Sequence, residues 1–133
     1  MVQGKKVLLV DDEEELVRAV SIRLRAAGYE VVTAGDGEEG LMKARSASPD
    51  LIILDLMMPK RDGYSVCRIL KFDNNFKNIP ILMLTARGQD KDKQMGTDLG
   101  ADGYITKPFE SEALLSAVKG FFEQIADRQK NLR

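Results

Sequence analysis

The chain of 133 residues is long enough to form one domain with a real hydrophobic core, and its formal net charge of −1 gives no overall basic surface for nucleic acid. The absence of histidine excludes the usual catalytic triads, histidine-ligated zinc and a phosphohistidine on this chain. The single cysteine excludes an intrachain disulfide and favours a reducing, cytoplasmic compartment, while no apolar run is long enough for a membrane span or a signal peptide.

Short apolar runs alternate with stretches of helical periodicity along the whole chain. In chain order we predict a strand at 5–10, a helix at 13–27, a strand at 29–33, a helix at 37–47, a strand at 51–55, a helix at 63–71, a strand at 80–84, a helix at 87–99, a strand within 100–106 and a helix at 110–126. The helix at 87–99 is the least defined, because Gly96 interrupts it and few apolar residues form a face. These elements predict one domain over residues 1–126 and a polar C-terminal tail at 127–133.

Glycine and acidic residues mark the helix ends. Gly28 is predicted to terminate the first helix. Asp36 is predicted to cap the second, with Glu39 as its capping-box partner. The strict alternation of strands and helices, with short connections, predicts an α/β fold. We expect a doubly wound five-stranded parallel sheet in the flavodoxin-like order 2-1-3-4-5, with helices on both faces.

The run at 51–55, with the sequence L-I-I-L-D, is the centre of this pattern. Its four apolar residues show no polar alternation, as expected for a strand buried on both faces of a parallel sheet. A carboxylate directly after such a strand is costly unless it lies near water or a cation. Asp55 is therefore predicted at the carboxyl end of the central strand, where open α/β sheets bind their ligands.

Polar residues also follow the other strands that surround this position. They are Asp11 and Asp12 after the first strand, Thr85 after the fourth, and Thr106 and Lys107 after the fifth. The exits of parallel strands lie at one edge, and the first, third, fourth and fifth strands are contiguous in the predicted order. We therefore expect the carboxylates, the hydroxyl and the amine to converge on one pocket.

Such a pocket is suited to phosphoryl transfer. Three crowded carboxylates repel one another, and Mg²⁺ bound by Asp11, Asp12 and Asp55 would relieve that repulsion. Asp55 is the predicted nucleophile, and its product would be an acyl phosphate. Lys107 would neutralise phosphoryl oxygens, and Thr85 would donate a hydrogen bond to one of them.

Each of these residues has a simpler structural interpretation when it is taken alone. The helix dipole favours the acidic run at 11–15 without any metal. Lys107 alone is an ordinary surface lysine, and Thr85 alone caps the turn after its strand. Their joint placement at one edge of the sheet is what favours a functional site.

With these residues in place, the sequence resembles the receiver domains of bacterial two-component response regulators, of the stand-alone chemotaxis-regulator type, over residues 5–125. The matching pieces are V-L-L-V-D-D-E at 7–13, D-L-I-I-L-D-L-M-M-P-K-R-D-G at 50–63, I-L-M-L-T-A at 81–86 and G-A-D-G-Y-I-T-K-P-F at 100–109. The resemblance implies that Asp55 is the phosphoacceptor, that Asp11 and Asp12 are the acidic pair, and that Lys107 binds phosphate. The main-chain carbonyl of Met57 would complete the Mg²⁺ site.

The resemblance also implies a switch and a set of partners. Thr85 would move toward the phosphoryl group, and Tyr104 would swing into the space behind it. The surface of the fourth helix, fifth strand and fifth helix would then bind a downstream protein. The donor would be a sensor histidine kinase or a histidine phosphotransfer protein, and the domain a monomer or a weak phosphorylation-dependent dimer. Such domains are regulators rather than enzymes, with at most self-catalysed phosphorylation and dephosphorylation, and their Lys107–Pro108 bond is expected to be cis.

Other interpretations remain open at this point. A haloacid dehalogenase-type phosphatase needs a second acid two residues after the nucleophile, where Met57 stands. An FMN binder needs a loop of hydroxyls and glycines where this chain has the acidic run at 11–15. The chain is expected to be either a stand-alone receiver or the receiver part of a longer transcriptional regulator. We expect no contact of this chain itself with nucleic acid or with a membrane.

Overall fold

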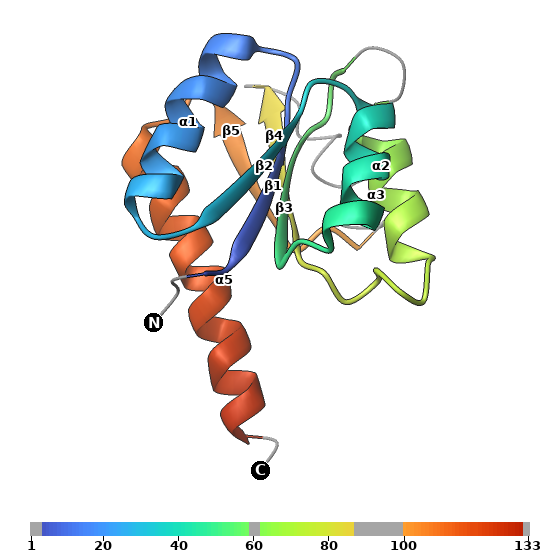
Figure 1. The fold of residues 1–133 in the computed structure, drawn as a ribbon, viewed down its shortest axis with the longest axis vertical. Helices are drawn as coiled ribbons and strands as arrows, with labels where there is room; N and C mark the ends of the chain where they lie inside the picture. Colours follow the sequence, from blue (N-terminus) through green and yellow to red (C-terminus); the bar gives the residue numbers. More distant parts are fainter. Residues whose placement is uncertain (1–3, 59–61, 87–99, 132–133) are drawn as a thin grey trace.

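The computed structural model describes residues 4–58, 62–86 and 100–131 as a parallel α/β structure (Figure 1). Its strands are β1 Lys6–Val10, β2 Glu30–Ala34, β3 Leu51–Asp55, β4 Ile81–Ala86 and β5 Gly103–Lys107. The described helices are α1 Glu14–Ala26, α2 Gly37–Ala47, α3 Gly63–Lys71 and α5 Ser111–Asn131. Neighbouring strands are parallel, and their order β2-β1-β3-β4-β5 confirms the predicted fold class. The helix predicted at 87–99 lies outside the described residues.

Helices cover both faces of this sheet, α1 and α5 on one face and α2 and α3 on the other (Figure 1). Alternate strand residues point to opposite faces, so each strand contributes to two cores. The core under α1 and α5 includes Val7, Leu9, Leu51, Ile53, Leu82, Leu84, Val20, Leu24, Leu114, Val118 and Phe122. The core under α2 and α3 includes Leu8, Val10, Ile52, Leu54, Ile81, Met83, Leu41, Ala44, Val66, Cys67 and Leu70. Burial on both faces explains why the apolar runs of β1, β3 and β4 lack polar alternation.

The helix ends follow the residues that the sequence marks. Gly28 follows Ala27, the C-cap residue of α1, and has a φ of 101°, a left-handed conformation that glycine adopts at little cost. The carboxylate of Asp36 accepts a hydrogen bond from the N–H of Glu39 at 2.9 Å and so caps α2. The carboxylate of Glu39 reaches back past Asp36 and accepts from the N–H of Gly35 at 2.6 Å. The predicted capping pair is therefore present, shifted by one residue on its return contact.

The C-terminal helix is longer than the sequence pattern predicts. The last apolar residues of its buried face suggest an end near residue 126, but α5 continues to Asn131. Residues 127–131 contain neither glycine nor proline, and arginine, glutamine and lysine are good helix formers. Helical propensity therefore accounts for the continuation of α5 to Asn131. Within the described parts of the chain, no helix combines the length and apolar character that crossing a membrane requires.

Gly63, the first residue of α3, lies against the backbone at the end of β3. Its N–H donates a hydrogen bond to the carbonyl of Leu56 at 2.9 Å. A Cβ atom at this position would fall on the carbonyl oxygen of Asp55 and lie 2.8 Å from the Cα atom of Leu56. Both neighbours are backbone atoms, so they cannot rotate away as the end of a side chain could. The close approach of α3 to Asp55 therefore requires glycine.

A Gly63→Ala variant is expected to lose about 1–3 kcal/mol of unfolding free energy, because the added methyl group overpacks a rigid contact. Urea unfolding followed by circular dichroism measures this loss. Gly120→Ala is the matched control, since a Cβ there meets no atom within 4 Å and should stabilise α5 by about 0.5–1 kcal/mol. Equal stability of Gly63→Ala and the wild-type protein would contradict the close packing of α3 on the end of β3.

Candidate functional site

Three carboxylates lie together at the carboxyl edge of the sheet. Asp11 follows β1, Asp12 follows Asp11, and Asp55 is the last residue of β3. One oxygen from each carboxylate lies within 4.8 Å of the others. Strand pairing produces this cluster, because Val10 is in register with Leu54 and the next residue on each strand is an aspartate. Asp11 and Asp55 are buried, with 1% and 6% of their surface exposed, whereas Asp12 is exposed.

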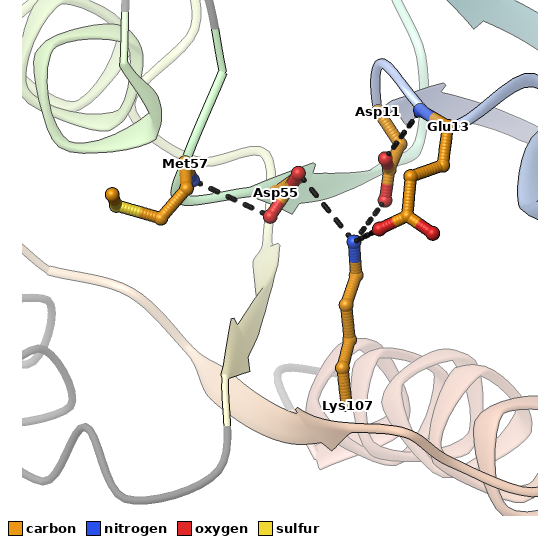
Figure 2. Close-up of polar contacts among 5 residues, drawn as sticks. All are labelled: Asp11, Glu13, Asp55, Met57 and Lys107. Carbon is orange, nitrogen blue, oxygen red and sulfur yellow. Dashed lines mark hydrogen bonds and ion pairs between the residues drawn. The ribbon is translucent and has the colours of Figure 1, made fainter.

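The ammonium of Lys107, at the end of β5, reaches into this cluster (Figure 2). Its Nζ atom lies 2.8 Å from Oδ2 of Asp11, 2.8 Å from Oε1 of Glu13 and 3.5 Å from Oδ2 of Asp55. The Lys107–Pro108 peptide bond is cis, as the resemblance implies. The side chain thus places one positive charge among the carboxylates of three different residues.

Burial and neighbouring charges shift the pKa values of Asp55 and Lys107. Burial raises the pKa of Asp55 to about 6, and repulsion by the Asp11 carboxylate adds to the effect. The charge of Lys107 and the N–H of Met57, 3.4 Å from Oδ1 of Asp55, oppose this rise in the pKa. Burial lowers the pKa of Lys107, but its contacts with Asp11 and Glu13 and the charges of Asp11 and Asp55 outweigh it. They raise the pKa of Lys107 above its usual value, so the lysine is charged at neutral pH.

The donor set fits a hard divalent cation. Oδ1 of Asp11 accepts the N–H of Glu13 at 2.9 Å, but the buried Oδ2 accepts no well-aligned hydrogen bond, although it lies beside the Lys107 ammonium. An oxygen in that situation gains from a cation. The three clustered aspartates supply oxygen ligands of the kind that Mg²⁺ prefers, and one ammonium does not balance their charge. Met57 contributes the N–H contact to Asp55, while its carbonyl remains a predicted ligand.

The predicted switch residues lie on β4, which pairs with β3, and on β5, which pairs with β4 at the edge of the sheet. Thr85 is buried in β4, in register with Thr106 of β5, and its hydroxyl donates a hydrogen bond to the Thr106 hydroxyl at 3.4 Å. Tyr104 is half-buried two residues before Thr106 and packs at the border of the core under α2 and α3. Thr85 and Tyr104 therefore lie on neighbouring strands and on the same face of the sheet.

Sequence reasoning missed one member of the cluster, Glu13. This residue was included in the acidic run at 11–15 but received no role. Its backbone at the start of α1 is extended, with φ −86° and ψ 100°. Its N–H donates a hydrogen bond to Oδ1 of Asp11 at 2.9 Å, and the carboxylates of both residues contact the ammonium of Lys107. No pattern within the acidic run could have identified it, because the contact joins residues 94 positions apart in the chain.

Comparison with known proteins agrees with this architecture. A sequence model described as the response regulator receiver domain matches residues 7–119. The alkaline phosphatase synthesis transcriptional regulatory protein PhoP of Bacillus subtilis is 48% identical over 121 residues, which are 91% of this chain and 50% of PhoP. This chain thus spans about half the length of that relative.

Solved structures give the same result at the level of the fold. Chemotaxis response regulator CheY4 of Vibrio cholerae superimposes with a TM-score of 0.83 at 42% identity, covering 88% of this chain and 98% of CheY4. The receiver domain of sensor histidine kinase PA1611 of Pseudomonas aeruginosa, solved with a magnesium ion coordinated in its active site cleft, gives a TM-score of 0.79. The PA1611 receiver domain is 30% identical to this chain, and the match covers 87% of this chain and 95% of the PA1611 receiver domain. The chain therefore belongs to the response regulator receiver domain family, which acts in two-component phosphorelay signalling.

Proposed function

We propose that this receiver domain accepts a phosphoryl group on the carboxylate of Asp55, in the presence of Mg²⁺. The observation that carries the proposal is the position of Asp55. It is a buried carboxylate at the end of the central strand, clustered with Asp11 and Asp12 and 3.5 Å from the ammonium of Lys107. Its nucleophilic oxygen thus has both acidic neighbours that suit a metal and a cation that suits a phosphate.

The transfer forms one bond and breaks one bond. A carboxylate oxygen of Asp55 attacks the phosphorus, and the bond from phosphorus to the donor nitrogen or oxygen breaks, leaving its electron pair on the donor. This chain has no histidine, so a phosphohistidine donor lies outside it, in a sensor histidine kinase or a histidine phosphotransfer protein. The product on this chain is an acyl phosphate.

Each neighbouring residue has a role in this proposal. Asp11, Asp12, Asp55 and the carbonyl of Met57 would hold Mg²⁺, which supplies positive charge beside the phosphoryl oxygens. The magnesium ion in the PA1611 receiver domain supports this assignment by similarity. Lys107 would pair with a phosphoryl oxygen, because its ammonium already lies beside the acceptor.

The switch in this proposal involves Thr85 and Tyr104. In the structure, the Thr85 hydroxyl donates a hydrogen bond to the Thr106 hydroxyl. On phosphorylation it would donate to a phosphoryl oxygen instead. Tyr104 would then turn inward, changing the surface of β5 and α5, where a downstream protein would bind; the predicted helix at 87–99, which the sequence assigns to the same surface, lies outside the described residues. Beryllofluoride, a phosphoryl mimic, is expected to shift the amide NMR signals of residues 85–106. Unchanged signals with the mimic bound would contradict the switch.

Phosphate incorporation tests the acceptor. Incubation with acetyl phosphate and Mg²⁺ is expected to add one phosphate, seen by intact mass as an acid-stable, base-labile adduct. The adduct should be lost in Asp55→Asn and after removal of Mg²⁺. Asp62→Asn is the matched control, because Asp62 caps α3 by accepting the N–H of Ser65 at 2.9 Å and asparagine caps equally well. An adduct that persists in Asp55→Asn would contradict the assignment. If the wild-type protein gains no phosphate, beryllofluoride binding is measured, because an acceptor that does not use acetyl phosphate should still bind this mimic.

The length of the relatives supports a second context for the same chemistry. PhoP is a transcriptional regulator about twice as long as this chain, so the domain is also proposed as the receiver part of such a regulator. In that case, the altered surface would act on an output domain, and contacts with DNA would belong to that domain. In either context, we propose a cytoplasmic monomer, or a dimer that forms weakly on phosphorylation.

A further inference from the structure

The ammonium of Lys107 is shared unequally among three carboxylates. Its distances to Asp11 and Glu13 are both 2.8 Å, whereas its distance to Asp55 is 3.5 Å. The ammonium thus lies closer to two residues of the β1–α1 connection than to the proposed acceptor (Figure 2). An incoming phosphoryl group on Asp55 has to compete with both of them for this charge.

Glu13 is held in place for this contact by its own backbone. Its N–H donates a hydrogen bond to Oδ1 of Asp11 at 2.9 Å, which fixes the position from which the side chain extends. The side chain is 60% exposed, so its carboxylate stands on the solvent side of the cluster. Asp11 is buried and belongs to the proposed metal site, but Glu13 is exposed and outside it.

We propose that Glu13 is a positioning residue that retains Lys107 on the Asp11 side of the site and thereby slows phosphorylation of Asp55. The proposal rests on the phosphoacceptor role proposed for Asp55. For Lys107 to pair with the phosphoryl oxygens, its ammonium has to leave Oε1 of Glu13. Because Glu13 is largely exposed, water can solvate it after the lysine leaves, so the restraint is weak and reversible.

Three variants separate this role from a general effect of charge. Glu13→Gln removes the negative charge. Glu13→Asp keeps the charge but shortens the side chain by one methylene group, so that it no longer spans the 2.8 Å contact with Lys107. Glu14→Gln changes the net charge equally at the next position, where α1 begins, and serves as the matched control. The rate of phosphate incorporation from acetyl phosphate with Mg²⁺ and the affinity for beryllofluoride are measured for each.

Glu13→Gln and Glu13→Asp are both expected to phosphorylate about two- to five-fold faster than the wild-type protein and to bind beryllofluoride correspondingly tighter. Glu14→Gln should match the wild-type protein in both measurements. The difference between Glu13→Gln and the wild-type protein should shrink at high ionic strength, because the Glu13 carboxylate faces solvent.

The outcomes distinguish this inference from the proposed function. Phosphorylation of the wild-type protein with unchanged or slower rates in both Glu13 variants would overturn the role of Glu13 and leave the acceptor in place. Acceleration in Glu13→Gln alone would also overturn it, because repulsion of the anionic donor would then explain the effect. Failure of the wild-type protein to gain phosphate or bind beryllofluoride would overturn the proposed function and this inference together.

Discussion

In metal-free buffer, a Lys107→Met variant is expected to unfold with a free energy about 1–3 kcal/mol below that of the wild-type protein. Methionine retains most of the apolar stem but removes the ammonium that lies beside Asp11, Glu13 and Asp55. The buried carboxylates then face one another without their neutralising charge, which costs folding free energy. Urea unfolding followed by circular dichroism gives the difference.

Added Mg²⁺ is expected to reduce this loss, because a divalent cation replaces the missing positive charge. Phosphate incorporation should nevertheless stay at least about 10-fold slower than in the wild-type protein, since a charged donor to the phosphoryl oxygens is gone. Lys119→Met is the control, because it removes one positive charge from a side chain that is 69% exposed in α5. Wild-type stability of Lys107→Met without metal would show that the lysine does not neutralise the cluster.

Replacement of Asp55, unlike replacement of Lys107, is expected to stabilise the folded protein. Without metal at pH 8, Asp55→Asn is expected to raise the free energy of unfolding by about 1–3 kcal/mol. The pKa of Asp55 is raised from 3.8 to about 6 in the folded protein, chiefly by burial. The folded state therefore holds the proton more tightly than the unfolded state, and ionisation of Asp55 destabilises the fold as the pH rises through this range.

The pH dependence follows from that sign. The gain in Asp55→Asn should be absent below about pH 4, grow as the pH rises, and be complete above about pH 6. Urea unfolding at a series of pH values measures it, and Glu30→Gln, at an exposed position of β2, is the control. A gain that does not depend on pH would mean that the ionised carboxylate of Asp55 is not the source.

In this site, repulsion between the carboxylates of Asp11 and Asp55 is opposed by their attraction to the ammonium of Lys107. Ionisation of Asp55 beside Asp11 is expected to destabilise the folded protein, and the charge of Lys107 partly offsets this effect. A bound divalent cation would compensate further, and a phosphoryl group would change the balance again by drawing Lys107 toward Asp55.

The sequence by itself determined the architecture and the location of the site. Apolar runs without alternation, separated by amphipathic helices, predicted a parallel sheet covered on both faces, and the observed strand order agrees. Asp11, Asp12, Asp55 and Lys107 were expected at one edge, because parallel strands place their ends together. These features follow from the local hydrophobic pattern and from the handedness of β–α–β connections. Both are properties of short segments, so they can be inferred from the sequence without knowing the tertiary contacts.

Only the tertiary structure decided how the charges are shared. The contact between Glu13 and Lys107 joins residues 94 positions apart, and no local pattern specifies which acid of the run at 11–15 meets the ammonium. The partner of Thr85 is likewise set by strand register, which aligns it with Thr106. The close approach of Gly63 to the backbone of Asp55 appears only when α3 packs on β3. Such details depend on distances of a few ångströms between separate elements, whereas the sequence pattern specifies only which element ends where.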